Sequence, residues 1–239
     1  ISTTNQIGNW SQTYNFLLPD ITTLSIDSET ASVELHHRKA MPQLNLPDFT
    51  DTYVIEGGSG SSSTHDTSGY IYVGEMSTGY QSAGLIKIPL NQLPTPSNAR
   101  ITNADLNLYS IFGSSIDEPL AIRPVLQNWN SDANDTTYDG INNWSVLGGR
   151  HIGTDVGTYV DIQDSVSADW MTWDVTEAIQ AAQAAGYSEL SLMIYASGSV
   201  TQDVVQFIST DSSSSDTPWL NLTWSNGSAT IPTVAGSNV

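Results

Sequence analysis

Two aromatic residues set in polar loops are the first candidates for chemistry in this chain. Trp144 lies in the run Asn142-Asn143-Trp144-Ser145, and Tyr138 lies six residues before Trp144. An exposed aromatic ring can stack on the apolar face of a sugar, because the negative face of its π-system attracts weakly positive C–H groups. Trp144 and Tyr138 therefore predict a glycan-binding site, and Trp170, beside another polar loop, is a further candidate.

The competing interpretation is that an aromatic residue in a β-rich protein belongs to the core. Trp129 follows the apolar run Ile122–Gln127, so we expect its ring to be buried. The same interpretation applies to Trp173, Trp219 and Trp224. The prediction of a glycan site therefore depends on the exposure of Trp144.

Three aspartates form a candidate calcium site. Asp51 opens the predicted main domain, and Asp211 and Asp216 flank a loop near its end. Calcium takes about six to eight oxygen ligands from carboxylates and carbonyls, so these residue types suit it. The alternative is a solvated acidic loop. A structural Ca²⁺ is thus the one cofactor that the sequence suggests.

A single basic cluster lies near the N-terminus, in the run His36-His37-Arg38-Lys39. On an otherwise acidic chain, these four residues predict a docking contact with an acidic surface, either of another copy of the chain or of a protein scaffold. Strands of such an arm could add to the sheet edge of another subunit. The alternative is an arm that packs on its own domain.

Residues suited to catalysis are few and scattered, so we expect no enzyme. No G-x-S-x-G run is present to place a nucleophilic serine. The seven glutamates fall in predicted turns, on polar strand faces or, for Glu177, in a predicted helix cap, so no pair is evident for glycoside hydrolysis. A polysaccharide-active enzyme remains only a distant alternative.

The charge balance narrows the possible partners. Six Lys and Arg residues stand against 25 Asp and Glu residues, for a formal net charge of −19. Nucleic acid is therefore excluded as an expected partner, because affinity for phosphates comes from Lys and Arg. No apolar run approaches the roughly 20 residues that span a bilayer, so membrane insertion is not expected. The low charged fraction of 13% and the abundant Ser and Thr favour an extracellular, cell-surface or virion-surface protein.

The alternation of apolar and polar residues predicts an all-β fold. In residues 101–111, Ala104, Leu106 and Leu108 alternate with Asp105, Asn107 and Tyr109, as in a half-buried strand. Helical spacing appears once, and it predicts a short helix at about residues 175–185. We therefore expect one antiparallel β-sandwich of jelly-roll type over residues 50–225, preceded by an N-terminal arm or strand extension (1–49) and followed by a flexible tail (226–239).

An ordered set of short signatures resembles the DNRLRE family, which has relatives among carbohydrate-binding modules. The resemblance covers about three quarters of the chain, from about residue 50 to about residue 225. It implies a non-catalytic β-sandwich module of surface and extracellular proteins. The signatures that carry it are Asp51–Val54, Tyr70–Gly74, Gly84–Leu90, Ile101–Tyr109, Trp173–Thr176, Phe207–Ser209 and Pro218–Leu220.

Two classes of function follow from these features. The separate arm and the self-repelling acidic body favour a structural or assembly protein, such as a subunit of an extracellular filament or surface layer, or a virion decoration or fibre protein. The resemblance favours the alternative, a glycan-binding adhesion module with polysaccharide as its partner. The two classes differ in whether the arm or the aromatic residues carry the function.

Overall fold

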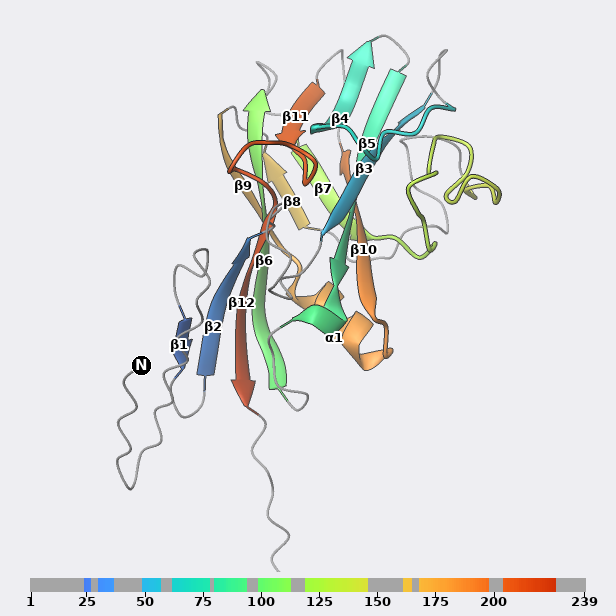
Figure 1. Cartoon of the computed structure of the whole chain (residues 1–239). Coiled ribbons are helices and arrows are strands. Elements are labelled where there is room, and N and C mark those ends of the chain that lie inside the picture. Colours follow the sequence, from blue (N-terminus) through green and yellow to red (C-terminus); the bar gives the residue numbers. More distant parts are fainter. Residues whose placement is uncertain are drawn as a thin grey trace, which may run out of the picture.

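A computed structural model gives the fold of this chain (Figure 1). It describes residues 24–26, 30–36, 49–56, 62–77, 80–93, 99–112, 119–145, 161–164, 168–197 and 204–226. All strand pairs of these residues are antiparallel. The strands are β1 (Leu24–Ile26), β2 (Thr30–His36), β3 (Thr50–Glu56), β4 (Tyr70–Ser77), β5 (Tyr80–Pro89), β6 (Ala99–Phe112), β7 (Pro119–Pro124), β8 (Asp161–Asp164), β9 (Asp169–Asp174), β10 (Glu189–Ala196), β11 (Val204–Ile208) and β12 (Trp219–Asn226).

The hydrogen-bonded sheet curls on itself into two layers. One layer, here the β5 layer, holds β3, β5, β10, β7 and β8, and the other, the β6 layer, holds β1, β2, β12, β6, β9, β11 and β4. The β4–β5 hairpin connects the two layers. The predicted all-β antiparallel sandwich with one short helix is therefore confirmed.

The main core fills the space between the two layers. Trp173 of β9 is fully buried, its ring packs edge-on against Phe207 of β11 at 5.9 Å, and its Nε1 donates a hydrogen bond to the carbonyl oxygen of Leu120 in β7 at 3.3 Å. Leu106 and Leu108 of β6 are also fully buried. The alternate residues of β6 must therefore face outward, because successive side chains of a strand point to opposite faces.

One short helix, α1 (Thr176–Ala184), closes one end of the sandwich (Figure 1). Its buried residues, Ala178, Ile179 and Ala182, follow the helical period and belong to the main core. Gly186, with a φ of +74°, stands just beyond its C-terminus, in the left-handed conformation that glycine adopts at little cost. Among the described residues, the helices are too short or too polar to cross a membrane.

The N-terminal strands add to the edge of their own β6 layer. β2 pairs with β12 from Trp219↔His36 to Ser225↔Thr30, and β1 pairs with β2. This pairing agrees with an arm that packs on its own domain. His37, Arg38 and Lys39 lie outside the described residues, so the predicted docking role of His36–Lys39 stays a prediction, as do the boundaries of the arm and the tail.

Candidate functional site

The loop that carries the predicted glycan-binding residues folds back onto the sandwich. Trp144 is only 3% exposed, and its Nε1 donates a hydrogen bond to the carbonyl oxygen of Asn134 at 2.7 Å. The partly buried Tyr138 packs edge-on against Trp144, with ring centroids 5.6 Å apart. The predicted exposure of Trp144 is therefore wrong, because long-range packing buries a ring whose neighbours in the sequence are polar.

Trp144 belongs to a second hydrophobic cluster, which covers the outer face of the β5 layer. Loop residues 125–145 supply the cover, and Val54, Leu85 and Met193 are among the fully buried strand residues beneath it. Trp129, which we predicted to be buried, is 2% exposed, so that prediction is confirmed. Figure 1 shows the yellow-green loop on the side of β3 and β5, so we call this surface the covered face.

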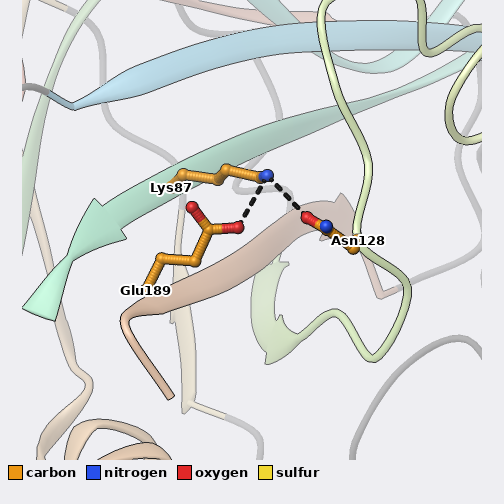
Figure 2. Close-up of polar contacts among 3 residues, drawn as sticks. All are labelled: Lys87, Asn128 and Glu189. Atoms are coloured by element: carbon orange, nitrogen blue, oxygen red, sulfur yellow. Dashed lines mark hydrogen bonds and ion pairs between the residues drawn. The ribbon is translucent and has the colours of Figure 1, made fainter.

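Lys87 holds the loop against the covered face. Its Nζ donates hydrogen bonds to Oε1 of Glu189 at 2.8 Å and to Oδ1 of Asn128 at 3.0 Å (Figure 2). The same Nζ lies 4.9 Å from the centroid of the Trp129 ring, within the range of a cation–π interaction. The Lys87 side chain is 13% exposed, so this cation serves the packing of the loop.

Three aromatic rings gather instead on the outer face of the β6 layer, where Tyr109 comes from β6, Trp170 from β9 and Trp219 from β12. Trp170 packs edge-to-face with Tyr109 at 5.3 Å and with Trp219 at 5.9 Å between ring centroids. All three residues are half-buried. We call these three residues the aromatic platform and the surface that carries them the open face.

The strand register explains why these residues meet. Tyr109 pairs with Trp170, and Asn107 of β6 pairs with both Trp219 and Thr172. Residues directly opposite each other in antiparallel strands share a face, and so do residues two apart on one strand. Three strands that are distant in the sequence thus bring their outward residues to one place. Sequence analysis assigned Trp219 to the core, and its half-buried position corrects that assignment.

Polar side chains continue the open face beyond the aromatic platform. Oδ2 of Asp105 accepts hydrogen bonds from the amides of Asn103 at 2.6 Å and Asn221 at 3.5 Å. Oδ1 of Asn107 accepts a hydrogen bond from the hydroxyl of Thr172 at 2.6 Å. We call these five residues the polar strip. Their mutual hydrogen bonds hold amide, carboxylate and hydroxyl groups in fixed positions next to the rings.

The predicted calcium residues lie at the junction of β3 with the loop between β11 and β12. Asp51 is 2% exposed, and its Oδ2 accepts a hydrogen bond from the backbone N–H of Thr210 at 2.7 Å. Burial raises the pKa of Asp51 to about 7; the hydrogen bonds from Thr210 lower this pKa, and the charge of Asp211 raises it. Asp216 hydrogen-bonds within its own loop, to Ser214.

These three aspartates do not converge on one point. Within the described ranges, no group of three or more His, Cys, Asp or Glu residues is placed to hold a metal ion. The hydrogen bond from Thr210 gives Asp51 a structural role, since it ties the start of β3 to the end of β11. Calcium binding at Asp51, Asp211 and Asp216 therefore stays a prediction.

Sequence reasoning missed two of the three platform residues, although one signal was present. Tyr109 follows the polar residues Asp105 and Asn107 at every second position of its strand. The apolar residues Leu106 and Leu108 lie between them, so this pattern predicts that the Tyr109 side chain faces outward. Trp170 was a candidate because it lies beside a polar loop. Nothing in the local sequence indicates that Trp219 joins them, because their contact depends on how β9, β6 and β12 pair.

Comparison with known families corrects the resemblance to the DNRLRE family. Residues 42–224 match the model of carbohydrate-binding module family 96. The DNRLRE assignment is wrong, although the expected kinship with carbohydrate-binding modules agrees with the match. The match starts after β2, so β1 and β2 lie outside the family unit.

Two further comparisons add little. Among solved structures, the xyloglucanase domain of NopAA, a type three effector from Sinorhizobium fredii in complex with cellobiose, is similar at 12% sequence identity. The similarity covers 85% of this chain and 94% of that chain, with a TM-score of 0.20, which is too low to support an inference about fold or ligand. No curated protein matches the chain.

Proposed function

Since the chain belongs to carbohydrate-binding module family 96, we propose that it is a non-catalytic module that binds polysaccharide on its open face. The observation that carries the proposal is the contact of Tyr109, Trp170 and Trp219, three half-buried rings from three strands, beside the polar strip. Aromatic faces and hydrogen-bonding side chains are the two kinds of group that sugar recognition uses.

The platform is suited to binding because its rings are already held in place. Trp170 meets its two neighbours at interplanar angles of 74° and 82°, and such edge-to-face contacts are favourable between aromatic rings. Each ring therefore has little rotational freedom left to lose when a ligand arrives. Preorganisation of this kind improves affinity by lowering the entropic cost of association.

The alternative of an assembly protein has less support. Family membership favours glycan binding, and β2 pairs with β12 of its own chain rather than standing free as a docking arm. We therefore place the function in the aromatic platform and not in residues 1–49. An extracellular or cell-surface location, where polysaccharide would be met, remains part of the proposal.

Alanine substitution at the centre of the platform tests the proposal. Trp170→Ala removes the ring that contacts both others, so we expect the affinity for a bound polysaccharide to fall about tenfold or more, by analogy with aromatic stacking on bases. Tyr187→Ala is the matched control, because Tyr187 is an aromatic residue that is 65% exposed and lies beyond α1. Calorimetry against a panel of soluble polysaccharides measures both variants. Equal affinity of Trp170→Ala and the wild type would refute the site.

A further inference from the structure

We infer that the polysaccharide-binding site extends beyond the aromatic platform onto β2, with His36 and Glu34 as ligand-contacting residues. This inference rests on the proposed function and adds to it a strand that lies outside the family unit, because the family match begins at residue 42. The aromatic platform stays the centre of the site, and β2 lengthens the face on which a ligand lies. The reasons are the direction in which the rings follow one another and the register of β2 on β12.

The rings of the platform form a row that runs across the strands. Trp170 of β9 is directly opposite Tyr109 of β6. Trp219 belongs to β12, which pairs with the other side of β6, since Asn107 pairs with residues of both β9 and β12. A glycan that stacks on all three rings therefore lies across β9, β6 and β12. The next strand in this direction is β2, which pairs with β12.

The register places polar residues of β2 beside the open-face residues of β12. His36 pairs with Trp219, and Glu34 pairs with Asn221 of the polar strip. Residues directly opposite each other in antiparallel strands share a face and are neighbours on it. His36 is therefore the next position after Trp219 in the row of rings, and Glu34 is the next position after Asn221 in the polar strip.

The sequence of β2 agrees with this register. Its apolar residues Val33 and Leu35 pair with Leu222 and Leu220, which are fully buried in the main core. The residues before, between and after Val33 and Leu35 are polar. A slip of one residue would move Val33 and Leu35 to the open face and the polar residues to the core side, so the alternation favours the observed pairing.

The residue types and the position of β2 suit a longer contact with a sugar chain. A glutamate carboxylate accepts hydrogen bonds, and a neutral imidazole both donates and accepts them, so Glu34 and His36 can both meet sugar hydroxyl groups. At about 4.8 Å between neighbouring strands, the four strands from β9 to β2 span about 14 Å, against about 10 Å for the three strands of the platform. A polysaccharide is long enough to follow the whole of this face.

A double variant, Glu34→Ala with His36→Ala, tests the inference on the whole chain. The calorimetric panel holds neutral polymers, xylan and glucomannan, and acidic ones, pectin and alginate. We expect the affinity for the polymer that the wild type binds most tightly to fall about threefold to tenfold, because the net contribution of one hydrogen bond is a factor of about that size. Glu189→Ala is the matched control, since it removes one negative charge from a side chain of the β5 layer that is 41% exposed, and its affinity should equal that of the wild type.

A second measurement separates contact with the ligand from support of β12. Hydrogen exchange, read by NMR, shows whether the β12 amides that face β2 remain protected in each variant, because paired amides exchange slowly. A second double variant, Glu34→Gln with His36→Gln, keeps hydrogen-bonding side chains on β2. We expect this variant to retain more of the affinity than the alanine variant does, with the β12 amides protected in both.

The outcomes separate this inference from the proposed function. Unchanged affinity in the alanine variant would overturn the inference, while a loss in Trp170→Ala would still support the platform as the site. A loss found only together with faster exchange of the β12 amides would show that β2 acts by supporting β12, and an equal loss in Glu189→Ala would trace the effect to net charge; either result would also overturn the inference. If no polymer binds, or if Trp170→Ala leaves binding unchanged, the proposed function fails together with the inference.

Discussion

The two outer faces of the sandwich use tryptophan in opposite ways. On the covered face, Trp129 and Trp144 are 2% and 3% exposed and hold a long loop on the β5 layer. On the open face, Trp170 and Trp219 stay half-buried and contact Tyr109. The difference shows that the polarity of neighbouring residues in the sequence does not decide whether an aromatic ring is available. The pairing of strands and the packing of loops on the sheet decide whether the ring is buried or exposed.

The largest expected effect on stability comes from a substitution on the covered face. Trp129→Ala removes a fully packed ring and the partner of the Lys87 cation, so we expect a loss of about 3–5 kcal/mol in the free energy of unfolding. Chemical denaturation measures the loss. Trp170→Ala should cost much less stability, because its ring is half-buried. A larger loss for Trp170→Ala would contradict the assignment of packing to one face and binding to the other.

The pH dependence of the free energy of unfolding tests the burial of Asp51, at the junction of β3 with the loop between β11 and β12. Because burial raises the pKa of Asp51 to about 7 in the folded state, from 3.8, folding takes up a proton at this group. The stability that proton uptake by Asp51 adds to the folded state is therefore fully present below about pH 4, and it is lost as the pH rises to about 7. At about 1.4 kcal/mol per unit of pKa, the loss has an upper limit of about 4 kcal/mol.

Asp51→Asn isolates this contribution. The asparagine amide keeps an oxygen that can accept the hydrogen bond from Thr210, and it does not ionise. We expect the variant to gain stability relative to the wild type as the pH rises from 4 to 8, measured by denaturation with EDTA present. A difference between variant and wild type that stays constant over this range would contradict the raised pKa.

The smallest expected effect on stability comes from Lys87, the cation of the covered face. Lys87→Met keeps most of the apolar stem but removes the ion pair with Glu189, the hydrogen bond to Asn128 and the cation–π contact with Trp129. Since the side chain of Glu189 is 41% exposed, solvent screens this pair, and we expect a loss of only about 1 kcal/mol. Binding on the open face should not change. A loss of glycan affinity in Lys87→Met would place the ligand on the wrong face for our proposal.

The fold was largely predictable from the sequence because the local periodicity of apolar residues indicates each strand and helix. The alternation at Leu106 and Leu108 marks the buried side of β6, and the helical spacing of Ala178, Ile179 and Ala182 marks α1. These patterns arise because each element must turn one side to a common core.

The site was only partly predictable because it depends on contacts between distant segments. Trp144 lies among polar residues, yet Asn134 and Tyr138 enclose it when the loop folds back. Trp219 reaches Trp170 only through the registers of β12 and β9 on β6. No local pattern encodes such a contact, so the sequence offered only separate clues, the polar loop beside Trp170 and the outward position of Tyr109.

The most direct test of the central claim follows the tryptophan indole N–H signals by NMR while a polysaccharide that binds in the calorimetric panel is added. The two faces predict separate sets of signals, since Trp170 and Trp219 lie on the open face, whereas Trp129 and Trp144 belong to the loop of the covered face and are buried against the β5 layer. We expect the signals of Trp170 and Trp219 to shift with saturation, and those of Trp129 and Trp144 to stay in place. Shifts confined to Trp129 and Trp144 would contradict the claim that the open face binds the glycan.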